Sequence, residues 1–497
     1  MGTEGAYLGV DVGTSSTKAV LVSGRGHLID SLVVQHSVQR GPDGLVEMDP
    51  QIWWEEFCRL FTELTDRTST DVLGIGVSGM GPCVALADQR DRILAPAALY
   101  GVDRRSREEI ELMTEALGED RLLMECDALL TSQAAGPKML WFSRHLSQGL
   151  APQTRAYMPA SWIIRHLTGE YVLDRHSASQ CTPFYSPERQ EWDYALAEEW
   201  IPDIELPRLG WSGDICGRTR AIDQIPGLPE GIPVIFGAID AWAEQESVGA
   251  VGVGELFLMY GTTLFLIANS AHRMRHPSMW GTTGTRSGTF NLAGGLASSG
   301  ALTDWFRDLS GIRDYQQLTG EASEISPGSH GLLTLPYFAG ERTPIQDPDA
   351  RGVILGLSVE HTRGHLYRSL LESTAFAVRH NIEVMEQAGA SIPSMSCAGG
   401  GVLSKLWPQI ISDVTGREQN VRRDTIGAAY GGAYMVARAL GAVDALDEWN
   451  PSSRTVSPRR VPIYEEMYQC YRELYEKTAE IQHRMTDLQR NVLTARD

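Results

Sequence analysis

The sequence predicts an α/β protein with two domains, and three observations support this prediction. The chain has 497 residues, which is more than usually fold around a single hydrophobic core. Short β-branched runs alternate with segments of helical periodicity, which is typical of α/β architecture. A hairpin with a Gly-Thr turn opens each half of the chain. We therefore expect duplicated domains that face each other across a cleft, with a boundary near Gly249 that gives domains 1–248 and 249–497.

Composition excludes several classes of protein. The formal net charge of -20, from 43 basic and 63 acidic residues, argues against nucleic acid or an anionic membrane as a partner. The seven cysteines are odd in number, scattered and never arranged as CxxC, so we expect neither a disulfide framework nor a zinc site. No signal segment precedes Tyr7 and no apolar run is long enough to span a bilayer. We expect a cytoplasmic protein.

The stretch "GVDVGTSSTKAV", residues 9–20, predicts the first hairpin. Strands over 7–11 and 18–22 flank a turn at 13–16, and a third strand follows. Such a turn offers backbone N–H groups and hydroxyls in a small concavity, which can bind phosphate without a large positive charge. Asp11, at the end of the first strand, could hold a magnesium ion through water. The alternative is an ordinary surface hairpin with polar turn residues.

Two further elements favour nucleotide binding. The stretch 255–268 predicts a second hairpin, with Gly261, Thr262 and Thr263 in its turn. In "SCAGGGVLSKLW", a strand runs into three glycines at 399–401, and Ser404 is the expected N-cap of a helix. Three glycines let a flat ring approach the backbone closely, whereas a helix-entry turn alone would need one. We therefore predict adenine binding at this loop.

The remaining elements are predicted from local signals. In "DPQIWWEEFCRLF", Asp49 is the expected N-cap and Pro50 the first residue of an amphipathic helix. Residues 72–80 form a buried strand that ends in a glycine loop, and residues 232–241 form a strand that delivers Asp240. A helix is predicted over 461–488, and the sequence leaves open which domain it packs on.

Several motifs in the expected order resemble those of one family. They include "GVDVGTSSTKAVLV", "GPKMLW" at 136–141, "GAIDAWAEQESVGAVGVG", "YGTT", "LPYFAGERTP" at 335–344, "AGGGVLSKLW" and "TIGAAYGGAYMVA" at 425–437. The chain resembles the FGGY carbohydrate kinases of the actin-like ATPase superfamily. The resemblance implies two actin-like, ribonuclease H-like domains, and a reaction in which ATP with Mg²⁺ phosphorylates a sugar hydroxyl.

The resemblance also implies roles for particular residues. Asp240 matches the catalytic aspartate, and Asp11 with Asp240 would organise the magnesium ion. The alternative for Asp240 is that it only caps a helix beginning at Ala241, where a cap carboxylate would keep a low pKa. Lys18 would pair with a phosphate or with Asp11. The nucleotide-binding residues implied are Gly13, Thr14, Ser15, Thr17, Lys18, Gly261, Thr262, Thr263, Gly300, Gly400, Gly401 and Ser404.

The sugar pocket is where the sequence departs most from its relatives. Its implied residues are Met80, Gly81, Asp103, Arg104, Asp240, Ala241 and Trp242. Pro82 stands where xylulokinases carry a histidine, and Ala241 stands where many carry an asparagine. Trp242 would add an apolar wall. Asp103 would accept two vicinal hydroxyls of the sugar, and its alternative is a solvated loop charge.

The expected substrate is a pentulose such as D-xylulose. Within the family the alternative is a kinase for another ketose, a polyol or a sugar acid, such as ribulose, glycerol or gluconate. An alternative of another class is an actin-like sensor that binds sugar or nucleotide without transferring phosphate, but no DNA-binding helix-turn-helix is evident before Tyr7. The resemblance also implies a possible homodimer.

Overall fold

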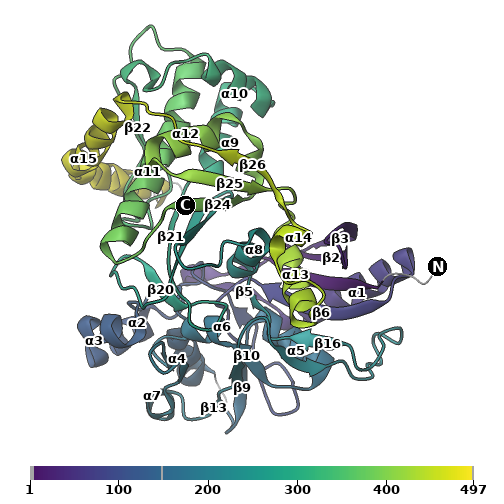
Figure 1. Cartoon of the computed structure of the whole chain (residues 1–497). Coiled ribbons are helices and arrows are strands. Elements are labelled where there is room, and N and C mark those ends of the chain that lie inside the picture. The colour runs from purple at the N-terminus through teal and green to yellow at the C-terminus, as the bar shows by residue number, and fades with distance from the viewer. Residues whose placement is uncertain (1–4, 147–148, 495–497) are drawn as a thin grey trace. The chain divides into compact units, whose positions relative to one another are not determined.

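The structure of the protein is a computed structural model that describes residues 5–146 and 149–494 (Figure 1). The chain divides into two compact units, and neither is one continuous stretch. Unit 1 contains the residues up to Val253 together with Ser270–Asn291 and Asp424–Pro451. Unit 2 contains Gly254–Asn269, Leu292–Arg423 and the residues from Ser452 onward. Within the described ranges, no helix is both long and apolar enough to cross a membrane.

The central sheet of unit 1 is mixed. Its strand order is β15 (Ile215–Arg218), β16 (Pro233–Ile235), β6 (Val72–Gly79), β1 (Ala6–Val12), β2 (Ser16–Ser23) and β3 (Leu28–Gln35), and β17 (Ala238–Ile239) also pairs with β6. Strands β1 and β2 form the predicted hairpin, with Asp11 opposite Lys18. β6 runs parallel to β1 on its other side, and this register places Asp11 beside Ser78. The first hairpin and the strand at 72–80 are confirmed.

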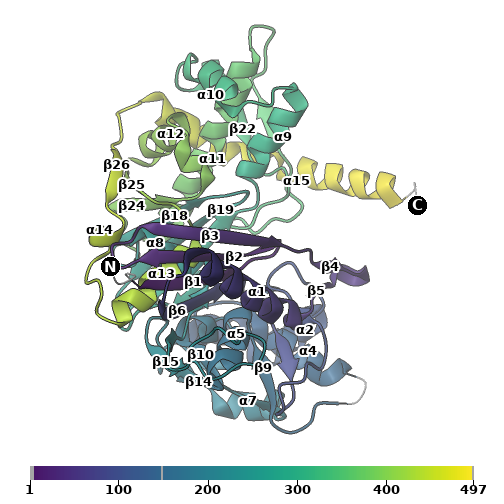
Figure 2. The same cartoon turned by 90° about the vertical axis from the view of Figure 1, so that its right-hand side faces the viewer.

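Alternation along β1 gives the sheet two different faces. Leu8 and Val10 belong to a core with the aromatic residues of α1 (Pro50–Thr68), which packs on the sheet at β2 and β3 (Figure 2). Tyr7 points to the opposite face and packs with α13 (Ala428–Ala439). Asp49 accepts a hydrogen bond from the Gln51 N–H and Pro50 is the first helical residue of α1, so the predicted helix start is confirmed.

Glycines let α13 lie directly on the sheet and on α8 (Asp240–Val248). A Cβ atom at Gly9 would stand 1.7 Å from the backbone oxygen of Ala429. A Cβ atom at Gly431 would stand 1.8 Å from the backbone oxygen of Ala243. Because these neighbours are backbone atoms, they cannot move aside as a side chain can. The close packing of α8 against α13 fixes the helix that begins at Asp240.

We expect Gly431→Ala to lower the free energy of unfolding by about 3 kcal/mol, because the new methyl group forces the two helices apart. Urea denaturation followed by circular dichroism measures this loss. Gly227→Ala is the matched control, since nothing lies within 4 Å of a Cβ at that position. Equal unfolding midpoints for the two variants would contradict the packing described here.

The other elements of unit 1 surround this sheet. Its further helices are α2 (Arg107–Leu117), α3 (Glu119–Cys126), α4 (Ala135–His145), α5 (Pro159–Thr168), α6 (Arg175–Ser179), α7 (Tyr194–Trp200) and α14 (Leu446–Trp449). Short strands form small separate sheets: β4 (Gln39–Arg40), β5 (Val46–Met48) and β8 (Ala97–Ala98); β7 (Ala85–Ala87), β9 (Thr154–Tyr157) and β13 (Ile204–Glu205); β10 (Val172–Asp174) and β14 (Arg208–Gly210); β11 (Tyr185–Ser186) and β12 (Glu191–Trp192).

Unit 2 repeats the arrangement of a hairpin beside a parallel strand. Its sheet has the order β21 (Phe290–Leu296), β19 (Leu264–Ser270), β18 (Glu255–Tyr260), β24 (Ser394–Ala398), β25 (Glu418–Arg422) and β26 (Ser452–Val456). β18 and β19 form the predicted second hairpin, and β24 runs parallel to β18. The repeat of hairpin plus parallel strand supports the predicted duplication.

The helices of unit 2 are α9 (Gly300–Ser310), α10 (Tyr315–Ser323), α11 (Arg363–Gln387), α12 (Leu406–Thr415) and α15 (Ile463–Thr494). α12 packs on β25 and β26, and α9 and α10 pack on α11. In a separate small sheet, β22 (Leu333–Leu335) pairs with β23 (Val353–Leu355). The predicted C-terminal helix is confirmed as α15, which packs on α11 of the same unit. The Phe376 ring lies 6.0 Å from that of Tyr464 and 5.7 Å from that of Tyr471. The C-terminal half of α15 projects past the other helices of unit 2 (Figure 2).

Candidate active site

Two carboxylates flank the carboxyl end of β6 in unit 1. Ser78 donates a hydrogen bond to Asp11 over 2.8 Å, from its Oγ to the Asp11 Oδ1. β17 pairs with the same end of β6, Ala238 opposite Ser78, and α8 begins immediately after it at Asp240. The Asp240 Oδ1 accepts the Ala241 N–H over 2.7 Å. The sheet register therefore brings together Asp11 and Asp240, which are far apart in the sequence.

Burial raises the pKa of both carboxylates, and the charge of Asp11 adds to the effect at Asp240. The pKa of Asp240 is raised to about 8, mainly by burial and then by the charge of Asp11, and these effects outweigh the bond from Ala241. The pKa of Asp11 is also raised by burial, which the Ser78 hydroxyl and Lys18 oppose. The alternative in which Asp240 only caps a helix and keeps a low pKa does not fit this raised pKa. α8 starts one residue earlier than expected, and burial dominates the titration of Asp240.

A divalent cation fits this pair, since its charge would stabilise two carboxylates whose ionised forms are disfavoured by burial and, at Asp240, also by the charge of Asp11. Among the residues the structure describes, no three His, Cys, Asp or Glu side chains are placed to hold a metal ion together. Asp11 and Asp240 offer hard carboxylate oxygens, and two side chains are too few for a closed protein cage. That is the donor set that suits Mg²⁺, which usually keeps several waters and binds phosphate oxygens.

Glu244 is a third carboxylate at this site that the motifs did not reveal. It lies one helical turn after Asp240, and its pKa is raised to about 7 by burial and by Asp11. Lys18 interacts with both Asp11 and Glu244, yet burial lowers its pKa overall. Its Nζ donates to the backbone oxygen of Ile426 over 2.7 Å. The i, i+4 spacing from Asp240 is the sequence signal that could have identified Glu244.

Because the pKa of Asp240 is raised in the folded state, the free energy of unfolding decreases as the pH rises. An unfolded Asp ionises near 3.8, whereas folded Asp240 keeps its proton until about pH 8. Between these values the folded state loses up to about 1.4 kcal/mol per pH unit from this group. We expect the metal-free protein to have a lower melting temperature at pH 8 than at pH 6, and Asp240→Asn to reduce the difference. An Asn variant with the same pH dependence as the wild type would refute the raised pKa.

Comparison with known proteins identifies the chain. Residues 6–245 match the N-terminal domain of the FGGY family of carbohydrate kinases, and residues 256–440 match its C-terminal domain. The chain belongs to the FGGY family. The protein is therefore a carbohydrate kinase, a phosphotransferase with an alcohol group as acceptor, and the predicted family is confirmed.

Individual relatives cover nearly the whole chain. It is 26% identical to the xylulose kinase of Escherichia coli strain K12 over 492 residues, which span 95% of this chain and 99% of that protein. It is 29% identical to the glycerol kinase of Alkalilimnicola ehrlichii, over 91% of this chain and 94% of that protein. The crystal structure of xylulose kinase from Rhodospirillum rubrum superposes with a TM-score of 0.87 at 28% identity, covering 96% of this chain and all of that one. The predicted two-domain actin-like α/β fold is confirmed.

In the first turn of this FGGY kinase, the predicted phosphate-binding residues do not all lie at the tip of the turn. Gly13 donates its N–H to the Ser16 backbone oxygen over 2.9 Å, and Thr14 and Ser15 stand at the tip between them. Thr17 requires a correction. Its side chain is fully buried and its hydroxyl donates to the Glu56 Oε2 over 2.5 Å, so it points into the core beneath α1. Side chains alternate along a strand, and Thr17 therefore faces away from Lys18.

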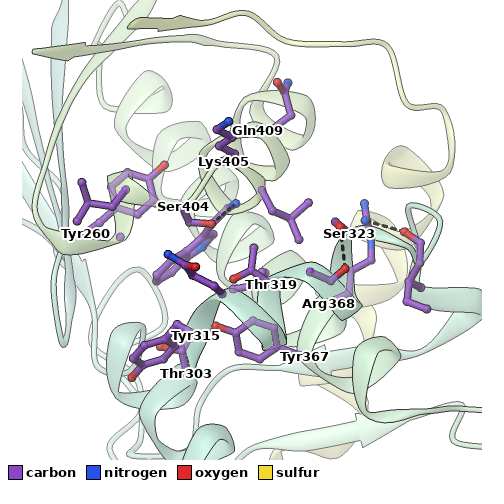
Figure 3. A pocket seen from close by; sticks show the side chains of 18 of the residues that line it. Tyr260, Thr303, Tyr315, Thr319, Ser323, Tyr367, Arg368, Ser404, Lys405 and Gln409 are labelled. Carbon is purple, nitrogen blue, oxygen red and sulfur yellow. Dashed lines mark hydrogen bonds between the residues drawn. The ribbon is translucent and has the colours of Figure 1, made fainter. Parts of the chain in front are cut away.

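The second turn belongs to a large cavity of unit 2. Its volume is about 1550 Å³, and side chains from α10 and α12, such as Thr319 and Gln409, border it (Figure 3). Tyr260 and Arg368 also line it. The FGGY residues predicted from sequence that line this cavity are Gly261, Thr262, Gly300, Gly400, Gly401 and Ser404. Thr263 lies in the turn and is absent from the lining residues.

Backbone contacts shape this cavity. Gly300 donates its N–H to the Gly261 oxygen over 3.0 Å, so the first turn of α9 contacts the turn of the second hairpin. Gly401 lies where a Cβ atom would stand 2.8 Å from the Cβ of Tyr260. Ser404 accepts the Trp407 N–H over 3.3 Å, although α12 itself begins at Leu406. Ser404 therefore caps the helix from two residues before it.

Two predicted sugar residues of this kinase are held inside unit 1 and need correction. Asp103 is fully buried, and its carboxylate accepts bonds from the Val46 N–H and from Nε and an NH₂ group of Arg105. It anchors its loop rather than offering two free oxygens. Trp242 is 4% exposed, donates to the Asn291 Oδ1 over 3.0 Å, and lies 4.0 Å from the His176 ring. Burial in the core removes it as a pocket wall.

The other predicted sugar residues lie on two loops and on the first turn of α8 in unit 1. Met80 is buried and Gly81 follows it directly after β6. Arg104 is exposed, and its backbone N–H donates to the Gly44 oxygen over 3.0 Å. Ala241 is half-buried beside Asp240 at the start of α8.

Proposed function

We propose that this FGGY kinase transfers the γ-phosphate of ATP to a hydroxyl of D-xylulose. The Asp11–Asp240 pair is the observation that carries phosphoryl transfer, because a buried pair of repelling carboxylates suits both a cation and a proton acceptor. D-xylulose is favoured because the E. coli relative, matched over 99% of its length, is a xylulose kinase.

Asp240 acts as the general base of this reaction. The sugar oxygen forms a bond to the γ-phosphorus, the bond from that phosphorus to the oxygen of ADP breaks, and the hydroxyl proton passes to the Asp240 carboxylate. A general base works best when its pKa lies near the working pH, and burial shifts the pKa of Asp240 upward from its ordinary value toward that range. Asp11 and Asp240 would hold Mg²⁺. When bound, that ion neutralises charge on the phosphate oxygens.

Nucleotide binding is proposed for the cavity of unit 2. The backbone at Gly400, Gly401 and Gly300 would face the adenosine, and the hydroxyl of Thr262 would meet phosphate oxygens. The predicted domain 1–248 would then bind the sugar and carry the first phosphate turn. The predicted domain 249–497 would bind the nucleotide. We also propose a homodimer and a cytoplasmic location. All seven cysteines lie in the described part of the chain and are free, which suits a reducing compartment.

A second candidate substrate follows from the departures in the pocket. Pro82 and Ala241 replace polar side chains that xylulokinases often carry, and Asp103 is occupied by Arg105. The A. ehrlichii relative, at 29% identity, is a glycerol kinase. A polyol such as glycerol, another ketose such as ribulose, or a sugar acid such as gluconate is therefore the alternative.

The experiment that tests this proposal is a substrate panel with coupled detection of ADP. Purified protein is assayed with ATP and Mg²⁺ against D-xylulose, D-ribulose, glycerol and D-gluconate. We expect the highest kcat/KM for D-xylulose. A higher value for another compound would replace it as substrate, and ADP formation from none of them would reject phosphoryl transfer to this class.

A further inference from the structure

Hydrogen bonds in unit 1 join the first phosphate turn to the two loops that carry the predicted sugar residues. These loops are residues 80–83 after β6 and residues 100–104 before α2. A third segment, residues 131–134 before α4, connects them. The side chains that form the connection are Tyr100 and Gln133.

The first connection runs from the phosphate turn to the second loop. The hydroxyl oxygens of Thr14 and Tyr100 lie 3.0 Å apart, so the two groups share a hydrogen bond. A hydroxyl has one proton to donate and two lone pairs. Tyr100 can therefore donate to Thr14 while Thr14 donates its own proton to a phosphate oxygen. Hydrogen bonds in such a chain polarise and strengthen one another.

The second connection runs between the two loops through one amide. The Gln133 Oε1 accepts the Gly101 N–H over 3.2 Å, and the Gln133 Nε2 donates to the Gly81 backbone oxygen over 3.3 Å. The orientation of the amide is fixed, because one partner can only donate and the other can only accept. A Cβ atom at Gly101 would stand 2.3 Å from the Gln133 Oε1, so a larger residue at position 101 would displace this amide.

A buried lysine holds the connecting segment in place. Ser132 donates from its Oγ to the Gly101 oxygen over 2.9 Å, so both backbone groups of Gly101 are bound by this segment. Lys138 on α4 is fully buried, and its Nζ donates to the backbone oxygen of Ser132. A displacement of Gly81 would therefore also move Tyr100, because the hydrogen-bonded groups of Gln133 and Gly101 between them are held in place.

We propose that Tyr100 and Gln133 are positioning residues that couple sugar binding to phosphate binding. A sugar against Gly81 fixes Gln133 and Gly101, and so orients the Tyr100 hydroxyl toward Thr14. A phosphate on Thr14 fixes the same hydrogen bonds from the other end. Each ligand then strengthens the binding of the other by the same factor, as linkage requires. The inference rests on the proposed function for the assignment of the two loops.

The test compares the wild type with Tyr100→Phe, which removes only the hydroxyl, and with Gln133→Leu. Calorimetry measures the Kd of β,γ-imido ATP with Mg²⁺, the Kd of adenosine, and the Kd of the sugar with the highest kcat/KM, with and without saturating imido ATP. We expect the sugar to bind the wild type about fivefold or more tightly when imido ATP is present. In both variants this factor falls below about twofold.

Nucleotide binding in the absence of sugar tests whether Tyr100 supports phosphate binding through Thr14. We expect Tyr100→Phe to weaken imido ATP about threefold or more, as loss of one hydrogen bond implies, and to leave adenosine unchanged. Tyr194→Phe, an exposed tyrosine of the same unit, is the matched control. Unchanged imido ATP binding and an unchanged coupling factor in Tyr100→Phe, or no coupling in the wild type, would overturn the inference. If the wild type still phosphorylates a sugar while one of these results is obtained, the inference fails and the proposed function stands.

Discussion

Asp240→Asn is expected to lower kcat by about 10²- to 10⁴-fold, the contribution of a positioned general base. The amide keeps the size of the carboxyl group, and its oxygen can still accept the Ala241 N–H, so α8 keeps its first turn. It cannot take the hydroxyl proton. Steady-state kinetics with the best sugar of the panel measures the loss.

Nucleotide binding and folding provide the controls for this variant. The cavity lined by Gly300 and Gly400 lies in unit 2, so we expect the Kd of adenosine to stay within about threefold of the wild type. At pH 8 the variant should melt no lower than the wild type, because a buried carboxylate is exchanged for a neutral group. Asp66→Asn, an exposed carboxylate on α1, should behave as the wild type. Near-normal turnover in Asp240→Asn would remove it as the base.

Asp11→Asn is expected to raise the Mg²⁺ concentration for half-maximal rate at least about tenfold, and to lower the maximal rate about 10²-fold. The oxygen of the new amide could still accept the Ser78 hydroxyl, so the loss reports charge rather than packing. Titration of the rate with Mg²⁺ at fixed ATP measures both quantities. A magnesium response like that of the wild type would assign the ion to other groups.

The same variant should also shift the pH dependence of the residual activity. The charge of Asp11 helps to raise the pKa of Asp240, so its removal lowers that pKa. The limb of the pH–rate profile that reports the base then moves to lower pH. An unmoved limb, with reduced rate, would mean that Asp11 and Asp240 do not interact.

The sequence alone determined those features that depend on local chemistry. The alternation of apolar residues and the Gly-Thr turns were sufficient to predict both hairpins. Asp49 followed by Pro50 was sufficient to predict the start of α1, because capping involves only neighbouring residues. The periodicity over 461–488 predicted α15 but gave no information on where it packs.

The tertiary structure decided the orientation and the partners of individual side chains. Thr17 and Asp103 match site motifs, yet Glu56 and Arg105 bind them inside the unit. Glu244 matches no motif, but α8 places it beside Asp11 and Lys18. Residues 424–451 belong to unit 1 although they follow most of unit 2 in the chain, because α13 packs on β1. Such outcomes depend on contacts between residues distant in sequence, and local pattern carries no information about them.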